Sequence, residues 1–253
     1  MKHLCVRLVS TLVLASTLVT FSFALVGCGS SNTVDQETQT TDGGTQTTDG
    51  GTQTTDGPTS SIQYPDTQSL VVHPDAKTYD TEKDVTFFVD SSGTYATMAG
   101  VINTSTPSLL EALLRDHPKV TLLLMYRVPG SDNDDANLVA ARMVRKAQIA
   151  TFVPADGLIA SGGTDFFIAG TKRMVVEGGK VGVHSWKSGD GKAATDFPRD
   201  SNEHDKYLQY YEEMGFSRQE AEDFYFFTIN AAGPDDMYNM TRDELIKYKV
   251  LAE

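Results

Sequence analysis

The chain has 253 residues, with 21 Lys and Arg against 34 Asp and Glu, a formal net charge of −13 and two cysteines. Both cysteines, Cys5 and Cys28, lie near the N-terminus, so the rest of the chain can form no disulfide framework, thiolate metal site or catalytic cysteine. The excess of acidic residues argues against a nucleic-acid partner, which would require a basic face. No histidine pair has metal-ligand spacing, so we expect neither a metal nor a cofactor.

The first 27 residues have the pattern of a signal peptide, because an apolar run from Leu8 to Val26 follows a basic N-terminus. The run ends at Leu25-Val26-Gly27-Cys28, which resembles the lipobox of bacterial lipoproteins. That resemblance implies cleavage before Cys28 and acylation of this cysteine with chains such as palmitate. A retained transmembrane anchor is the alternative, but six hydroxyl residues dilute the run. We therefore expect a lipoprotein of the cell envelope, anchored to a membrane on its extracytoplasmic side.

Residues 28–61 comprise Cys28 and a stretch of Gly, Ser, Thr, Gln and Asp with almost no apolar side chain. The unit Thr-Gln-Thr-Thr-Asp-Gly recurs from Thr38, Thr45 and Thr52, but this seven-residue spacing has no apolar positions that could form a coiled-coil seam. We expect a disordered, solvated tether. The folded domain then covers residues 62–253, with 19 basic and 29 acidic residues and a net charge of −10.

Within this domain short apolar runs alternate with helical periods, which predicts an α/β layered fold with a largely parallel sheet. The first half is expected to contain strands over Val85–Val89, Tyr95–Ile102 and Val120–Met125, and helices over Pro107–His117 and Asp134–Lys146. The apolar side chains of these two helices are expected to face inward; they are Leu109, Leu110, Leu113, Leu114, Leu138, Val139, Met143 and Val144.

The second half is expected to contain strands over Thr151–Val153, Met174–Val176 and Val181–Ser185, and helices over Ser161–Ala169, Glu203–Met214, Ser217–Asn230 and Thr241–Tyr248. Two of these helix starts carry capping boxes, in which Ser217 pairs with Glu220 and Thr241 with Glu244. The polar segment Lys187 to Asp205 is expected either as a substrate-side lid or as a surface insertion.

The candidate chemistry lies where strands end. Ser161 stands in Gly157-Leu158-Ile159-Ala160-Ser161-Gly162-Gly163, immediately before an apolar helix, where unpaired backbone N–H groups can stabilise a developing oxyanion. Two interpretations remain at this point: a nucleophilic serine, or an N-cap followed by a tight glycine turn. The pattern is not the G-x-S-x-G elbow, because Ile159 occupies the first glycine position, so an α/β-hydrolase assignment loses its main support.

Two further segments accompany Ser161. His184 ends the apolar strand that contains Val181-Gly182-Val183, where a histidine can act as a general base or be structural. The turn Val128-Pro129-Gly130-Ser131 follows a buried strand and precedes a helix, so it is either a second oxyanion donor or a simple Pro-Gly turn.

Four segments follow one another along the domain: Val128-Pro129-Gly130-Ser131, Ala160-Ser161-Gly162-Gly163, Ala169-Gly170-Thr171-Lys172-Arg173 and Gly182-Val183-His184. Their order and approximate spacing resemble those of the Clp protease proteolytic subunit and its Clp/crotonase superfamily, from Val85 to Leu251. The similarity is greatest to exported Clp-like proteins, where the serine lies in C-x-S-A-C; Ile159 and Gly163 replace those cysteines here. The resemblance implies a layered α/β fold with repeated ββα-type units and a helical C-terminal part.

Carried over residue by residue, the resemblance implies Ser161 as nucleophile and His184 as general base. The oxyanion hole would consist of the backbone N–H of Gly162 and that of Gly130 or Ser131. An aspartate of the stretch 233–238 would complete a triad; Asp236 is favoured over Asp235, and both can instead be solvent charges beside a helix. A Ser-Lys dyad, as in the related signal-peptide peptidases, is the alternative, with Lys187, Lys192 and Lys206 as its candidates.

These patterns lead to a hypothesis of function with alternatives from other classes. The first is a membrane-tethered extracytoplasmic serine peptidase-like hydrolase that cleaves peptides or proteins by Ser-His(-Asp) acyl transfer. The others are a catalytically inactive Clp-like binding lipoprotein and a crotonase-type acyl-CoA enzyme, although an exported protein would rarely meet acyl-CoA. An aromatic-rich pair of predicted helices, Tyr207–Tyr211 and Phe224–Phe227, is expected mostly in the core and leaves homo-oligomerisation or a peptide-binding face open.

Overall fold

The computed structural model describes residues 62–252. The expected signal peptide, Cys28 and the tether lie outside the described residues. The helices and strands follow in the order η1 (Thr67–Ser69), α1 (Pro74–Thr78), β1 (Thr86–Val89), β2 (Tyr95–Ala99), α2 (Thr106–Asp116), β3 (Leu122–Val128), α3 (Asp134–Lys146), β4 (Ala150–Val153), β5 (Leu158–Ala160), α4 (Gly162–Ile168), β6 (Arg173–Val175), β7 (Lys180–Val183), η2 (Ala194–Asp196), η3 (Asn202–His204), α5 (Asp205–Glu213), α6 (Arg218–Ala231), β8 (Tyr238–Asn239) and α7 (Arg242–Lys247).

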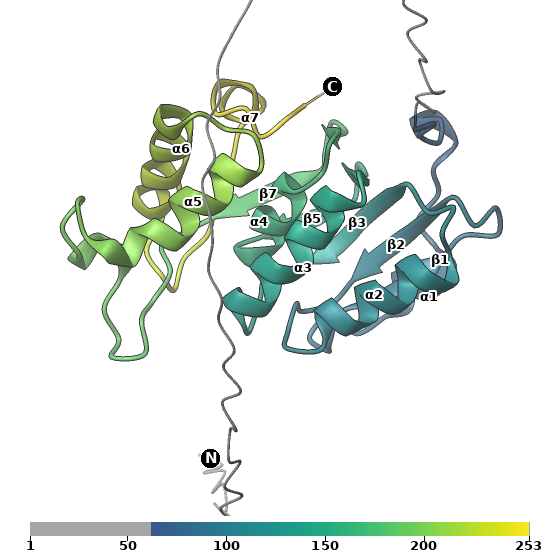
Figure 1. Ribbon diagram of the computed structural model, residues 1–253, viewed down its shortest axis with the longest axis horizontal. Coiled ribbons are helices and arrows are strands. Elements are labelled where there is room, and N and C mark those ends of the chain that lie inside the picture. The colour runs from purple at the N-terminus through teal and green to yellow at the C-terminus, as the bar shows by residue number, and fades with distance from the viewer. Residues whose placement is uncertain (1–61, 253) are drawn as a thin grey trace, which may run out of the picture. The chain divides into compact units, whose positions relative to one another are not determined.

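The predicted α/β fold class is confirmed, with an eight-stranded sheet that is mostly parallel. Its main path is β1-β2-β3-β5-β7-β8, and antiparallel pairs occur only at the two ends of that path, β1 with β2 and β7 with β8. ββα units recur as β1-β2-α2 and β4-β5-α4. Helices α2 and α3 lie side by side across the sheet, and the C-terminal helices α5, α6 and α7 gather at one end of it (Figure 1).

Strand β3 divides the sheet into two branches. Its N-terminal part, Leu122 to Leu124, pairs in parallel with β4, whereas Arg127 and Val128 pair in parallel with β5. Strand β4 continues to β6, and β5 continues to β7. The branch through β5 and β7 is the one that ends at the candidate catalytic residues.

Side chains of β3 alternate between two buried clusters, as the period of a strand requires. Leu123 and Met125 join the main cluster, which lies beneath α2, α3, α5 and α6. Leu122 and Leu124 join a smaller cluster with Val72 and Ala76 from the segment before β1. Burial on both faces explains why this strand is a nearly continuous apolar run in the sequence.

The predicted bounds of α3 are confirmed, but part of its predicted inward face is wrong. Leu138 and Val144 are buried as expected, whereas Val139 is 49% exposed. The small residues Ala140 and Ala141 are completely buried instead, because α3 packs closely against both α2 and α4. Helix α2 differs in the same way, since Leu109 is 40% exposed while Leu110 and Leu113 are buried.

Two short strands were not expected from the sequence. Strand β5 contains three residues and β8 contains two, so neither gives a recognisable apolar alternation. The two strands β6 and β7 do not pair with each other, although only four residues separate them. Both predicted capping boxes are present, at the start of α6 and at the start of α7.

The segment between β7 and α5 is more closely attached to the core than its polar composition suggests. His204, which lies in this polar segment, is 1% exposed. Its Nδ1 lies 2.8 Å from the Tyr225 hydroxyl and its Nε2 lies 3.0 Å from the Pro198 carbonyl oxygen. Trp186 donates to the same Tyr225 hydroxyl. These bonds hold the segment against α6.

Among residues 62–252, no helix is both long enough and apolar enough to cross a membrane.

Candidate active site

Three parallel strands bring the expected site residues to one edge of the sheet. Strand β5 lies between β3 and β7 and pairs with both in parallel, so the carboxyl ends of all three are adjacent. The turn 129–131 follows β3, Ser161 follows β5 and His184 follows β7. The Ser161 backbone N–H also donates to the Gly182 carbonyl oxygen, which fixes the end of β5 against β7.

Ser161 has an unusual backbone conformation, with φ 52° and ψ −129°. A residue with a Cβ atom rarely adopts this region, and holding it there costs on the order of 1–3 kcal/mol. The side chain makes no N-cap hydrogen bond to α4. Its Oγ lies 2.8 Å from His184 Nε2 instead. The structure therefore gives no support to the N-cap interpretation of Ser161.

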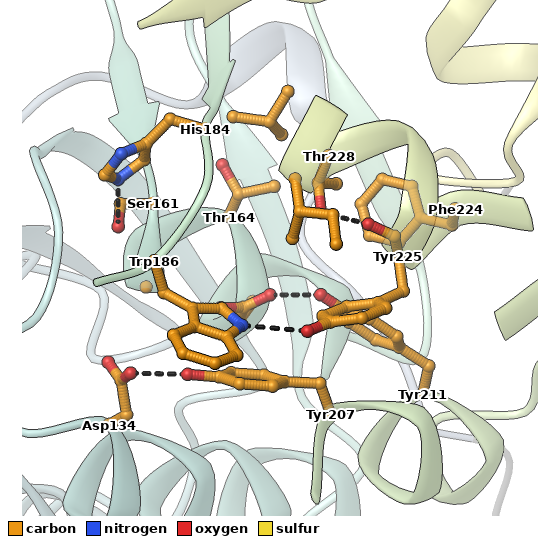
Figure 2. Close-up of a pocket in the computed structure, with 14 residues that line it drawn as sticks. Asp134, Ser161, Thr164, His184, Trp186, Tyr207, Tyr211, Phe224, Tyr225 and Thr228 are labelled. Atoms are coloured by element: carbon orange, nitrogen blue, oxygen red, sulfur yellow. Dashed lines mark hydrogen bonds between the residues drawn. The ribbon is translucent and has the colours of Figure 1, made fainter. Parts of the chain in front are cut away.

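The hydrogen-bond partner of the second ring nitrogen of His184 identifies the tautomer of the imidazole. Nδ1 lies 3.1 Å from the Pro234 carbonyl oxygen, which can only accept a hydrogen bond. Nδ1 therefore carries the proton, and the neutral imidazole presents the lone pair of Nε2 to the Ser161 hydroxyl. This is the arrangement that a general base requires before it removes the hydroxyl proton (Figure 2).

Neither candidate aspartate lies against the imidazole. Asp235 is exposed and forms an ion pair with Lys187, at 2.8 Å. Asp236 is also exposed, and its backbone N–H donates to the Gly233 carbonyl oxygen in the same turn. The group that holds Nδ1 is the backbone oxygen of Pro234, one residue before the pair. A backbone oxygen has no side-chain signature, so the sequence contains no signal that could have identified it.

We expect Asp235→Asn and Asp236→Asn each to leave the rate of Ser161 acylation within about twofold of the wild type, because neither carboxylate touches His184. The measurement is the second-order rate constant for labelling by a fluorophosphonate. A loss of tenfold or more in the Asp236 variant would show that the turn rearranges to place an aspartate on the ring.

The three candidate lysines of a Ser-Lys dyad are engaged with carboxylates elsewhere. Lys187 pairs with Asp235, Lys192 with Asp190 and Lys206 with Asp135. Within residues 62–252, the only side chain hydrogen-bonded to Ser161 Oγ is that of His184.

Near Ser161, the backbone N–H groups of Gly162 and of Ser131 have no acceptor among the described residues. The Ser161 carbonyl accepts from Thr164 and Asp165 along α4, so the N–H across the same peptide, that of Gly162, points out of the helix start. The Gly130 carbonyl accepts from Ile102, beyond the end of β2. The Ser131 N–H belongs to the same peptide group as the Gly130 carbonyl. In a trans peptide the two point in opposite directions, so this N–H points away from β2 and toward β5.

Close packing explains the glycines around this pair of donors. A Cβ on Gly130 would lie 3.4 Å from the Cβ of Ser161, which shows how near the turn approaches the serine. A Cβ on Gly162 would lie 2.2 Å from Ser131 Oγ and 2.9 Å from Asn137 Nδ2. Asn137, which is buried, donates to the Gly162 carbonyl oxygen at 2.8 Å and so fixes the first turn of α4.

Beside Ser161 and His184 lies a pocket with about 450 Å³ of empty space, including the part open to solvent. Its walls are largely aromatic, and its polar groups include two carboxylates (Figure 2). The residues that line it are Asp134, Ser161, Gly162, Thr164, Asp165, Val183, His184, Trp186, Tyr207, Tyr211, Phe224, Tyr225, Thr228 and Ile229.

The two carboxylates are held by hydroxyl groups. Asp134 accepts from Ser131 Oγ and from the Tyr207 hydroxyl, each at 2.6 Å, and Asp165 accepts from the Tyr211 hydroxyl at 2.6 Å. Burial and nearby carboxylates raise the pKa of Tyr207 and of Tyr211 well above the ordinary value, so both hydroxyls remain donors. Neither aspartate could be identified from the sequence, because each is held at the site in part by a tyrosine of the distant helix α5.

Burial raises the pKa of Asp165 to about 7; the Tyr211 hydrogen bond opposes this shift and the charge of Asp134 adds to it. Since the folded chain binds this proton more tightly than the unfolded chain, the free energy of unfolding falls as the pH rises from about 4 through 7. Above that range the folded protein must keep a charge that is largely removed from water.

We therefore expect Asp165→Asn to raise the melting temperature at about pH 8.5 by on the order of 5 °C, and to change it little at about pH 4. Asparagine keeps an oxygen for the Tyr211 hydroxyl but cannot ionise. Thermal unfolding across pH measures the effect, and Asp135→Asn, on an exposed neighbour, is the matched control. An equal shift at both pH values would contradict the assignment.

Among the residues that the structure describes, no group of three or more His, Cys, Asp and Glu side chains could hold a metal ion.

No protein-family model matches the chain, and a comparison with curated proteins gives no match. Solved structures of a 1510-N membrane-bound stomatin-specific protease are similar in two mutant forms, one in complex with a substrate peptide. The peptide complex is 16% identical over 60% of this chain and 71% of that chain, with a TM-score of 0.40. The other form is 16% identical over 60% of this chain and 75% of that chain, with a TM-score of 0.41.

Proposed function

We propose that the chain is a serine hydrolase that cleaves peptides or proteins through an acyl-enzyme on Ser161. The observation that carries the proposal is the 2.8 Å contact between Ser161 Oγ and His184 Nε2, with Nδ1 fixed as the protonated nitrogen by Pro234. The strained backbone of Ser161 supports it, because a serine that merely opened a helix would gain nothing from that conformation.

The reaction follows from these contacts. His184 Nε2 takes the hydroxyl proton as Ser161 Oγ attacks the substrate carbonyl carbon, and the negative charge moves to the carbonyl oxygen. The N–H groups of Gly162 and Ser131 are the donors for that oxygen, and one such donor contributes about 3–4 kcal/mol to lowering the barrier. The C–N bond then breaks, and the leaving amine takes the proton from His184. A water that His184 deprotonates hydrolyses the ester and restores Ser161.

Peptides are the substrate class in this proposal because the four segments from Val128 to His184 resemble those of the Clp protease proteolytic subunit in order and spacing. We place the chain in the Clp/crotonase superfamily on the same ground. In this proposal the site is a serine–histidine dyad rather than a triad completed by an aspartate, because the group that contacts His184 Nδ1 is the uncharged carbonyl of Pro234.

The test of the proposed function is covalent labelling by a fluorophosphonate, compared between the wild type and Ser161→Ala. The proposal expects one adduct on the wild-type chain, located on Ser161 by peptide mass analysis, and none on the variant. Ser188→Ala, an alteration in the loop after His184, is the control and should label normally. A folded wild-type chain that does not label at any concentration would instead favour a catalytically silent binding protein.

The membrane tether is part of the same proposal and rests on Leu25-Val26-Gly27-Cys28. We expect Cys28→Ser to abolish incorporation of labelled palmitate and to move the protein out of the membrane fraction, because acyl chains supply the hydrophobic attachment. Cys5→Ser is the matched control and should change neither property. Membrane association that survives in the Cys28 variant would indicate a retained N-terminal anchor.

A further inference from the structure

The pocket beside Ser161 is lined by two carboxylates and by no lysine or arginine side chain. Asp134 and Asp165 face it from the starts of α3 and α4, respectively. Within residues 62–252, neither forms an ion pair with a Lys or Arg; the basic residues nearby pair with exposed carboxylates, Lys206 with Asp135 and Lys187 with Asp235. Among the described residues, neither carboxylate of the pocket therefore has a Lys or Arg partner within hydrogen-bonding distance.

Asp165 is placed so that a ligand can reach it. It lies in the first turn of α4, four residues after Ser161, and both residues line the pocket. The Tyr211 hydroxyl donates a hydrogen bond to Asp165 Oδ1, but no described group donates one to Asp165 Oδ2. Among the described residues, Asn137 Oδ1 is the one fully buried side-chain oxygen or nitrogen that has no hydrogen-bond partner. Asp165 Oδ2 also has no partner, so it is not fully buried and remains accessible from the pocket that Asp165 lines.

The walls suit a long cationic side chain. Trp186 and Tyr207 are stacked with ring centroids 6.2 Å apart, and Tyr207 stacks on Tyr225 at 5.6 Å. Because these rings stack on one another, the aromatic surface that lines the pocket offers apolar contact to the methylene stem of a lysine or arginine, and the charged end is left to the carboxylates. In Figure 2 the Trp186 ring lies between the serine–histidine pair and Asp134, and the Tyr207 ring lies beside Asp134. The net charge of −10 over residues 62–253 also attracts cationic peptides.

We propose that this pocket receives a lysine or arginine side chain of the substrate, on the residue whose carbonyl carbon Ser161 attacks, with Asp165 as the main specificity-determining residue. The inference rests on the proposed function. The incoming cation supplies the counter-charge that Asp165 and Asp134 lack, and a buried charge is tolerated when it is paired and hydrogen-bonded. An apolar side chain of equal length would leave both carboxylates without that partner.

The first experiment compares three diphenyl phosphonate probes that react with serine nucleophiles and carry the side chain of lysine, norleucine or glutamate. Norleucine matches the lysine stem without its charge. The lysine probe should label Ser161 about 10- to 100-fold faster than the norleucine probe, and the glutamate probe should be slowest. Asp165→Asn should reduce the lysine preference to about threefold or less, whereas Asp135→Asn, the exposed control, should keep it.

The second experiment measures binding without catalysis, by calorimetry of Ser161→Ala with peptides that carry lysine or norleucine at the cleavage position. Tighter binding of the lysine peptide, lost in the double variant with Asp165→Asn, supports the inference. Equal binding, or a faster norleucine probe, overturns it and leaves fluorophosphonate labelling intact. Failure of fluorophosphonate labelling overturns the proposed function alone, since the binding comparison does not require a reactive serine.

Discussion

His184→Ala is expected to slow fluorophosphonate labelling of Ser161 by about 10²–10⁴-fold, because it removes the only side chain hydrogen-bonded to the serine hydroxyl among the described residues. The melting temperature should stay near that of the wild type. His184 is half-buried, and its two ring contacts are with Ser161 and with the Pro234 carbonyl oxygen, neither of which joins separate layers of the core.

His204→Ala provides the matched control for this prediction. His204 is almost fully buried and connects Tyr225 of α6 to the Pro198 carbonyl oxygen. Its loss leaves buried polar groups unpaired, which costs about 1–3 kcal/mol, so the melting temperature should fall while the folded fraction still labels. If His184→Ala instead lost stability and kept its labelling rate, His184 would be a structural residue.

Arg173→Met is expected to lower the free energy of unfolding by about 3 kcal/mol, equivalent to roughly 10 °C in melting temperature. Arg173 is 6% exposed, and burial of its guanidinium lowers the pKa of Arg173 to about 10. It donates to four carbonyl oxygens, those of Ile168, Gly170, Lys249 and Val250. Methionine fills a similar volume but leaves all four without this donor.

These bonds fasten the C-terminal end of the chain to the end of α4 and to β6, where the Arg173 backbone also pairs with Ala252. The measurement is urea unfolding, with Arg115→Met as control because Arg115 is exposed and pairs with its neighbour Asp116. The control should change stability by less than about 0.5 kcal/mol. Similar midpoints for the two variants would show that the carbonyl groups find other partners.

The two residues at the centre of the site could be found from the sequence because their signals are local. Ser161 and His184 each end a short apolar run, and parallel strands place such ends at one edge. The bounds of strand β5, which ends immediately before Ser161, could not be predicted, since three residues show no alternation. The structure supplies that strand, and with it the reason why Ser161 and His184 meet.

Other features depended on contacts between distant segments. His204 lies in a polar stretch, and only its bond to Tyr225, 21 residues later, explains its burial. Val139 fits the helical period of α3, yet its exposure follows from the close approach of α2 and α4 to the alanine face. The Pro234 carbonyl oxygen reaches His184 from 50 residues away and belongs to the backbone, so no residue type could have indicated it.

The position of Trp186 has a consequence for spectroscopy. It is the single tryptophan of the chain, it lines the pocket beside Ser161, and its indole N–H donates to Tyr225. The emission of an indole changes in wavelength and intensity with its hydration and its hydrogen bonding. Intrinsic tryptophan fluorescence therefore reports on this one pocket, and occupancy of the site can be followed in the unlabelled protein.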